Sequence, residues 1–379
     1  MRQQARRRLI KTIEGRLNGG QTFIPSSNLI FTDVPLTSQH PNLLRINMKY
    51  LGQESDFSNS SQRVGVLLCN LGTPDRPVCP SLRKYLAEFL MDPRVIELPK
   101  LLRTILVRGI IVNFRSHKSA ATYREIWTED GSPLLLNSQR LSDKVGLSLG
   151  DKFQVEVAMR YGNPSIESKV KKLHQSGVRT VIVIPMYPQY SGSTNGSTFD
   201  ALSAALIKQR WVPNLKFVSD YYQQKSYIAG VGDSIKTHWK IHGKKQKLVM
   251  SFHGVPKKFT ERGDPYEWQC RESAQRIADY LELTSDEWIL VFQSRLGAEE
   301  WLQPYCDKTL TALPGEGIKS VDIVCPGFSA DCLETLEEIE GENKDYFMDA
   351  GGEAYSYIPC LNDSDQHVGI IKDIILKQL

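Results

Sequence analysis

Residues 64–74 read VGVLLCNLGTP, and residues 247–256 read KLVMSFHGVP. Each stretch is a short apolar run that leads into a glycine followed two positions later by a proline. An apolar run without polar alternation is typical of a strand buried on both faces of a parallel sheet. Glycine and proline mark the point at which the chain turns after such a strand. The two stretches therefore predict equivalent strand-to-helix turns in two related halves of the chain.

Six more apolar runs of this kind occur along the chain. Strands are expected at residues 64–69, 153–158, 180–186, 216–219, 247–252, 288–292, 320–325 and 355–358. Amphipathic segments lie between them, for example at residues 165–174, 226–242, 268–280 and 304–313. Strands that alternate with helices form parallel sheets. The sequence therefore predicts an α/β fold of two similar Rossmann-like lobes, each a four-stranded parallel sheet flanked by helices, with a cleft between the carboxyl ends of the sheets.

The two lobes are unequal in size, because residues 75–130 form an insertion in the first. We expect lobe 1 at residues 61–225, lobe 2 at 226–360, and a C-terminal helix at 361–379 that packs back on the body. Residues 93–118 of the insertion hold six basic residues, one acidic residue and many aliphatic ones. This composition predicts a basic, apolar lip beside the cleft, which suits a flat apolar ligand with carboxylates or a membrane surface.

The net charge of the chain, +4, arises entirely near its start. Residues 1–60 hold eight Lys/Arg and four Asp/Glu, whereas the remaining 319 residues hold 39 of each. We expect residues 1–60 to be a disordered or loosely ordered extension, and an Arg-rich transit peptide for organellar import is the alternative. A body without net charge argues against a nucleic-acid partner. No run of roughly 18 uncharged apolar residues is present, which argues against a transmembrane helix.

One histidine and a row of acids stand where strands end. His253 follows a buried strand directly, and ligand sites of open α/β folds gather at that edge. If the segment after the strand at 320–325 is helical, Asp331, Glu334 and Glu338 share one face of it. Three carboxylates on one face are stable when they are solvated, or when a cation or proton lies among them. The residues alone indicate a divalent-metal site of nitrogen and oxygen ligands, with a solvated acidic face as the alternative.

Two polar clusters also follow strands. Arg160-Tyr161-Gly162 follows the second, and the stretch from Tyr187 to Ser193, which includes Tyr190, follows the third. Aromatic rings and hydroxyls there suit a flat ligand with polar edges, although these are also ordinary loop residues. No glycine-rich phosphate-binding motif follows a strand, so nucleotide binding is unsupported.

Seven segments of the chain resemble the ferrochelatase family, the enzymes that insert ferrous iron into protoporphyrin. These segments, in order, are LLCNLGTPDRP, YREIWTEDGSPL, AMRYGNPS, PMYPQYSGST, SFHGVPKKF, VFQSRLGAEEWLQPY and CPGFSADCLETLEEI. They run from about residue 63 to the C-terminus, and they are most like the enzymes of Gram-negative bacteria. The resemblance implies a lyase that converts protoporphyrin IX and Fe²⁺ into protohaem and two protons, the last step of haem biosynthesis.

The resemblance also implies roles for particular residues. The metal-site histidine and glutamate of the family match His253 and Glu334, and both are expected to be catalytic and to contact the metal. Asp331 and Glu338 match the acidic relay for protons or metal behind that glutamate.

Six residues are expected to contact the porphyrin. They are Leu71, Tyr123, Ser132, Arg160, Tyr161 and Tyr190. Leu71 takes a position that holds Met in animal enzymes and Tyr in Gram-positive relatives that use coproporphyrin. The absence of Tyr there favours protoporphyrin, and a leucine cannot ligate the metal.

No tightly bound cofactor is expected. Many family members bind a [2Fe–2S] cluster through a cysteine-rich C-terminal extension, but no cysteine follows Cys360 here. The seven cysteines form no C-x-x-C pair, which favours free thiols in a reducing compartment. We therefore expect a cytoplasmic enzyme, with peripheral contact to the inner membrane as an option. Two alternatives remain: a chelatase of the same fold that loads cobalt or nickel into another tetrapyrrole, and a tetrapyrrole-binding module without activity.

Overall fold

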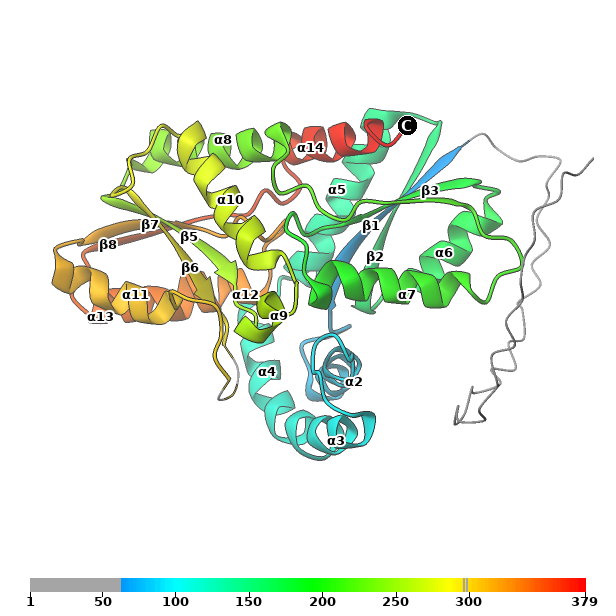
Figure 1. Ribbon diagram of the computed structural model, residues 1–379, viewed down its shortest axis with the longest axis horizontal. Helices are drawn as coiled ribbons and strands as arrows, with labels where there is room; N and C mark the ends of the chain where they lie inside the picture. The colour runs from blue at the N-terminus through cyan, green and yellow to red at the C-terminus, as the bar shows by residue number, and fades with distance from the viewer. Residues whose placement is uncertain (1–62, 296, 298) are drawn as a thin grey trace, which may run out of the picture. The chain divides into compact units, whose positions relative to one another are not determined.

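The computed structural model describes residues 63–295, 297 and 299–379. Within them lie two four-stranded sheets whose neighbouring strands are all parallel (Figure 1). The first sheet contains β1 (Val64–Thr73), β2 (Phe153–Gly162), β3 (Thr180–Pro185) and β4 (Asn214–Phe217), in the order β2-β1-β3-β4. The second contains β5 (Lys247–His253), β6 (Trp288–Gln293), β7 (Ser320–Val324) and β8 (Ala354–Ile358), in the order β6-β5-β7-β8. The same order in both sheets confirms the predicted pair of similar lobes.

The turns after β1 and β5 also match each other in detail. A Cβ atom on Gly72 would lie 1.8 Å from the carbonyl oxygen of Tyr161, at the end of the neighbouring strand β2. A Cβ atom on Gly254 would lie 2.7 Å from the carbonyl oxygen of Gln293, at the end of β6. Real Cβ atoms do not approach a carbonyl so closely, so both turns require glycine. This shared requirement explains the repeated glycine in the sequence.

Helices cover both faces of each sheet. Around the first sheet lie α5 (Pro133–Leu149), α6 (Ile166–Gln175) and α7 (Ser197–Leu206). Around the second lie α8 (Lys225–His242), α10 (Tyr266–Tyr280), α11 (Cys306–Ala312), a 3₁₀ turn η3 (Leu313–Glu316) and α13 (Asn343–Asp349). The shorter elements near the strand ends are α9 (Lys257–Glu261), α12 (Leu333–Leu336) and two π-helical turns, η2 (Gly192–Gly196) and η4 (Glu338–Glu342).

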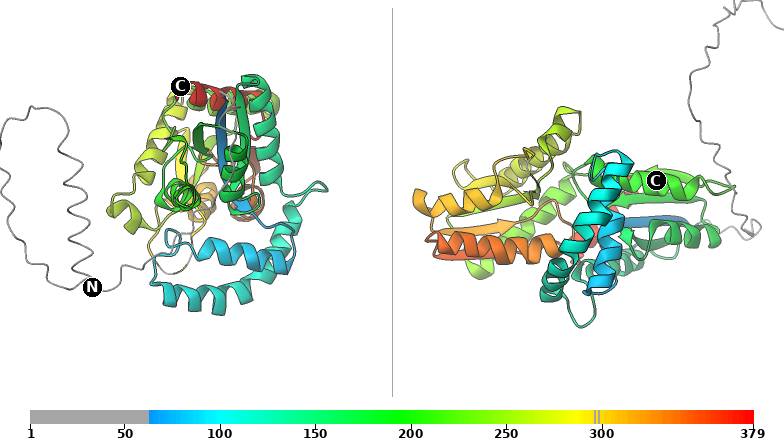
Figure 2. Two further views of the ribbon diagram at one scale, coloured as in Figure 1. Left: turned by 90° about the vertical axis from the view of Figure 1, so that its right-hand side faces the viewer. Right: turned by 90° about the horizontal axis from the view of Figure 1, so that it is seen from below.

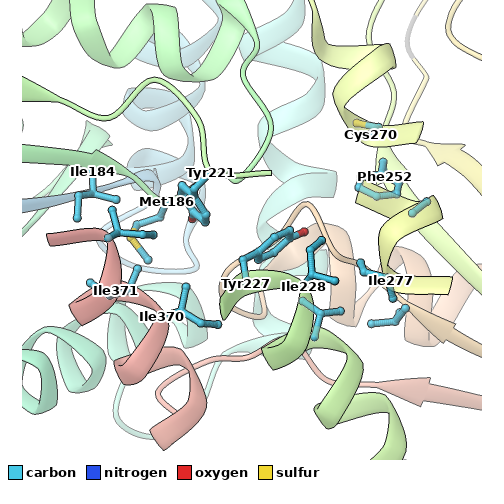
Figure 3. Packing of buried hydrophobic residues seen from close by; sticks show 14 of the residues in the cluster. Ile184, Met186, Tyr221, Tyr227, Ile228, Phe252, Cys270, Ile277, Ile370 and Ile371 are labelled. Atoms are coloured by element: carbon cyan, nitrogen blue, oxygen red, sulfur yellow. The ribbon is translucent and has the colours of Figure 1, made fainter. Parts of the chain in front are cut away.

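Successive residues of β1 point to different hydrophobic clusters. Val66 and Leu68 belong to a central cluster, whereas Leu67 and Cys69 pack with α6 and α7 on the opposite face. Side chains of a strand alternate between faces, so a strand with two buried faces is apolar throughout. The central cluster contains residues of both sheets and of α5, α8 and α10, and Figure 3 shows part of it.

The C-terminal helix α14 (Asp365–Leu376) completes that central cluster. It packs against α5 and α8 (Figure 1), and its buried residues include Ile370 and Ile371, both visible in Figure 3. The helix begins where the Ser364 hydroxyl accepts a hydrogen bond from the backbone N–H of His367, a typical N-cap. The predicted boundaries between the two lobes and this helix stay predictions.

The insertion is helical. It comprises α2 (Cys79–Leu90), α3 (Lys100–Thr104), a π-helical segment η1 (Ile105–Ile111) and α4 (Val112–Ile126). In Figure 1 and in the left view of Figure 2, these helices project below the two sheets. Among the described residues, no helix is both long enough and apolar enough to span a membrane. The predictions about residues 1–60 fall outside the part of the chain that the structure describes.

Candidate functional site

His253 is the last residue of β5 and lies directly beside Gln293, the last residue of β6. Its side chain is half-buried, and its Nδ1 atom lies 2.6 Å from the carbonyl oxygen of Gly254. A carbonyl oxygen can only accept a hydrogen bond, so Nδ1 donates and Nε2 keeps its lone pair in the neutral ring. The ring of Phe328, on the loop after β7, lies 6.4 Å away between centroids. His253 is thus placed at a carboxyl edge with one nitrogen available as a base.

Glu338 lies close to this histidine. Its carboxylate accepts hydrogen bonds from the backbone N–H of Ser294, at 2.7 Å, from the Ser294 hydroxyl and from the Gln293 amide, at 3.3 Å. Burial raises the pKa of Glu338 above its ordinary value, although the hydrogen bond from Ser294 opposes the rise. The nearby charge of Glu334 raises the pKa further. The structure therefore brings His253, Glu334 and Glu338 within electrostatic reach of one another.

The three acids do not share one helical face, so that prediction is wrong. Helix α12 begins only at Leu333, because Cys332 caps it: the backbone N–H of Cys332 donates to the Thr335 hydroxyl at 3.0 Å. Asp331 therefore precedes the helix. Glu338 follows α12 and begins the π-helical turn η4.

Asp331 is buried and faces a different set of partners. Its carboxylate accepts hydrogen bonds from the Tyr357 hydroxyl at 2.6 Å, the Asn362 amide at 2.6 Å and the backbone N–H of Cys360 at 3.2 Å. These bonds fix the loop before α12 to the end of β8 and the segment after it. A role for Asp331 in a relay stays a prediction, and its contacts are those of a structural anchor.

Arg160 and Tyr161 at the end of β2 are held by Asp92 of the insertion. The Asp92 carboxylate lies 2.5 Å from the Arg160 guanidinium and 2.9 Å from the Tyr161 hydroxyl, and it accepts from the Ser197 hydroxyl at 2.6 Å. Burial opposes ionisation, but the bonds from Ser197, from the Arg94 N–H and from Tyr161 lower the pKa of Asp92. The Tyr161 hydroxyl is already occupied by its hydrogen bond to Asp92. The residue is completely buried, so its ring has no exposed surface for a macrocycle.

The other predicted porphyrin contacts occupy separate places. Leu71 is half-buried and packs in one cluster with Tyr123 and with Leu333, the residue before Glu334. Ser132 is buried and precedes α5 at its N-cap position. Tyr190 is half-buried, and its backbone N–H donates to the Gln269 side chain at 2.6 Å. Leu71 therefore lies beside the helix that carries Glu334.

Sequence reasoning missed Asp92, Gln293 and Ser294. Gln293 and Ser294 stand in a segment that matched the resemblance, but no local pattern marks them as parts of the site. Ser294 has a positive φ of 60°, which is uncommon for a residue with a side chain. Only the structure shows that this conformation aims both its N–H and its hydroxyl at Glu338.

No three His, Cys, Asp or Glu side chains form a complete metal-binding group in the described part of the chain. The donors at the carboxyl edge of the second sheet are a neutral imidazole nitrogen and carboxylate oxygens. Such donors suit a first-row divalent ion, and they also suit the uptake of protons.

Comparisons with known proteins show what the chain is similar to. A family model described as Ferrochelatase matches residues 63–379. The ferrochelatase of Marinobacter nauticus is 48% identical over 332 residues, which cover 86% of this chain and 90% of that protein. The ferrochelatase of Thioalkalivibrio sulfidiphilus is 49% identical over 331 residues, with 86% and 90% covered. Among solved structures, SirB from Bacillus subtilis matches with a TM-score of 0.45 and 12% identity, over 83% of this chain and 95% of that one.

Proposed function

The chain belongs to the ferrochelatase family, and we propose that His253 and Glu334 carry the insertion of Fe²⁺ into protoporphyrin IX. This reaction yields protohaem and two protons and is the last step of haem biosynthesis. The observation that carries the residue assignment is the group at the carboxyl edge of the second sheet. There the Nε2 nitrogen of His253 is available as a base, Glu338 lies within electrostatic reach of both His253 and Glu334, and the backbone carbonyl of Glu334 accepts a hydrogen bond from Gln293.

The chemistry requires a metal ligand and proton acceptors together. A free-base porphyrin is planar, and its two pyrrole N–H protons must leave as iron enters. Binding a bent macrocycle between the lobes would favour a shape close to that of the transition state. His253 Nε2 accepts one pyrrole proton, and the Glu334 carboxylate holds the incoming Fe²⁺ substrate. Glu338 takes up a released proton, since burial raises its pKa and so favours the protonated carboxyl.

The proposed porphyrin contacts come from the first lobe. Leu71 gives an apolar contact beside α12, and Tyr123, Ser132 and Tyr190 are proposed to contact the macrocycle from the same lobe. Arg160 acts from the Asp92 network rather than as a free cation.

An anaerobic assay with Fe²⁺ and protoporphyrin IX tests this function. The purified chain should form protohaem, and His253→Ala and Glu334→Ala should each abolish this activity. Parallel assays with sirohydrochlorin and Co²⁺ or Ni²⁺ test the other chelatase activity. Tight protoporphyrin binding without any turnover would instead indicate a binding module and contradict the proposal.

We further propose that the protein holds no [2Fe–2S] cluster. Six of the seven cysteines are buried, and burial raises the pKa of the thiols of Cys325, Cys332 and Cys360. Cluster ligands are thiolates, which this burial disfavours. The protein purified without oxygen should therefore lack the visible absorption of such a cluster. A cluster spectrum that disappears in Cys325→Ser or Cys332→Ser would contradict this.

The lip is proposed to rest on a membrane. Leu101 and Phe114 are 73% and 78% exposed, and Ile105 and Ile110 are also exposed. Basic residues share these helices, among them Lys100, Arg108, Arg115 and Lys118. An amphipathic surface of this composition binds anionic lipid headgroups while its apolar side chains enter the interface. We therefore propose a cytoplasmic enzyme that contacts the inner membrane peripherally.

A further inference from the structure

Within the described part of the chain, Gln293 forms hydrogen bonds with the turn that follows His253, with the backbone of Glu334 and with the carboxylate of Glu338. It ends β6, pairs with His253 in the sheet register, and is only 3% exposed. Both its backbone and its side chain take part. The mechanism above assigns it no chemical step.

The backbone of Gln293 orients His253. Its carbonyl oxygen accepts a hydrogen bond of 2.7 Å from the N–H of Gly254. The carbonyl oxygen of Gly254 in turn accepts from Nδ1 of His253 at 2.6 Å. The Gly254 peptide is therefore held between the two residues, and it fixes the tautomer of the imidazole.

The side chain of Gln293 holds the acidic segment. Its amide Nε2 donates to the backbone carbonyl of Glu334 at 2.7 Å and to the Glu338 carboxylate at 3.3 Å. Its Oε1 accepts from the Ser251 hydroxyl of β5 at 2.8 Å. Because the Glu334 carbonyl can only accept, the amide nitrogen must face the acidic segment, and this side chain has one orientation available.

We propose that Gln293 is the positioning residue that sets the separation between the His253 base and the Glu334 metal ligand. This inference rests on the proposed function. One buried residue fixes the imidazole through its main chain and the Glu334 carbonyl through its side chain. A displacement of about 1 Å between reacting groups can cost about 10²-fold in rate.

Gln293→Met tests the hydrogen bonds of the side chain. Methionine has similar length and no hydrogen-bonding amide, and the main-chain hydrogen bond to Gly254 remains. We expect kcat/KM for Fe²⁺ to fall by about 10–100-fold, while KM for protoporphyrin stays within about twofold and the cooperative melt is retained. A loss of fold alone would not separate the two substrates in this way.

Gln154→Met is the control. Gln154 lies at the start of β2, at the opposite edge of its sheet from the carboxyl ends of the strands, and its amide donates to the Glu156 carboxylate at 3.2 Å. The same substitution there removes an amide donor away from the candidate site. We expect kcat/KM for Fe²⁺ within about twofold of wild type.

Ser251→Ala is a milder second variant, which serves if Gln293→Met does not fold. It removes the hydrogen bond to Gln293 Oε1, and we expect a fall of about 2–5-fold in kcat/KM for Fe²⁺ with KM for protoporphyrin unchanged. The inference is overturned if folded Gln293→Met matches wild type, if Gln154→Met loses as much activity, or if Ser251→Ala, as the only folded variant, is unaffected. A wild-type chain that inserts no iron would overturn the proposed function instead.

Discussion

The orientation of the His253 imidazole depends on the carbonyl group of Gly254. That contact commits Nδ1 as a donor and leaves Nε2 as the proposed base. Glycine is required at 254 because of the close approach to Gln293, so the turn and the tautomer are fixed together.

His253→Ala should lower the rate of iron insertion by about 10²–10⁴-fold, since removal of a general base typically has this effect. Protoporphyrin binding should remain largely intact, because the alanine removes no part of the first lobe. Initial anaerobic rates and an absorbance titration with porphyrin measure the two quantities. His242→Ala, on the exposed end of α8, is the control. A variant that retains more than about a tenth of the wild-type rate would contradict the role.

His367 should make stability depend on pH. Burial lowers the pKa of this histidine to about 4, and its Nδ1 lies 2.6 Å from the carbonyl oxygen of Asn362. Above about pH 6.5 neither the folded nor the unfolded state holds the proton, and the full stability is present. As the pH falls below that value, only the unfolded state takes up the proton, so the free energy of unfolding decreases.

Urea unfolding at pH 7 and pH 5 measures this dependence. Wild type should lose about 2 kcal/mol more over that interval than His367→Gln, which has no group to titrate there. The comparison is between slopes, so it holds even if the substitution lowers stability at both pH values. Equal losses in the two proteins would show that His367 does not stay neutral when folded.

The insertion differs from the other helical elements in what it exposes. Helices α5 and α14 expose one large apolar residue each, Leu147 and Leu376, whereas α3, η1 and α4 together expose several. Arg103 is an exception among the basic residues, because its guanidinium donates to the carbonyl groups of Ile96 and Leu98 inside the lip. Four other basic residues of these elements are Lys100, Arg108, Arg115 and Lys118.

Leu101→Glu and Phe114→Glu should each weaken binding to vesicles that contain anionic lipid, by about tenfold, since each removes apolar area and adds a repelled charge. Co-sedimentation with anionic and neutral vesicles measures the change. Leu147→Glu is the matched control, because Leu147 is 84% exposed but belongs to α5 rather than to the insertion. Equal effects of all three substitutions would show that the lip is not the contact surface.

At the scale of the whole molecule, two sheets with the same strand order present different side chains at equivalent turns. Leu71 precedes Gly72 as His253 precedes Gly254, so the two side chains stand at equivalent turns. Leu71 packs in one cluster with Leu333, and His253 is the proposed base. The equivalent turns thus carry an apolar side chain in one lobe and the proposed reactive side chain in the other.

Removal of residues 1–47 should change neither the fold nor the rate of iron insertion. The composition changes near residue 60, and the family match begins at residue 63. A chain that starts at Met48 should therefore show the same circular dichroism, melting temperature and activity as the full chain. Loss of soluble expression, or import of the full-length protein into an organelle, would show that the leader matters.

The sequence by itself determined the eight strands and their grouping, because a strand buried on both faces must be apolar along its whole length. It also predicted His253 as a site residue, because a polar residue directly after such a strand lies at the edge where parallel sheets bind ligands. The predicted strand limits differ from the observed ones by a few residues: β1 and β2 run four residues further at their carboxyl ends, whereas β4 begins and ends two residues earlier than predicted.

Only the tertiary structure decided which residues share the site. Gln293 and Glu334 are 41 positions apart, and Asp92 and Arg160 are 68 apart, yet each pair is joined by a hydrogen bond. Periodicity records which face of an element is buried, but a hydrogen bond across elements leaves no periodic trace. The start of α12 likewise depended on the Cys332 cap, which separated Asp331 from the other acids. The local sequence pattern predicts the strands and helices, whereas contacts between residues far apart in the chain determine which side chains meet at the candidate site.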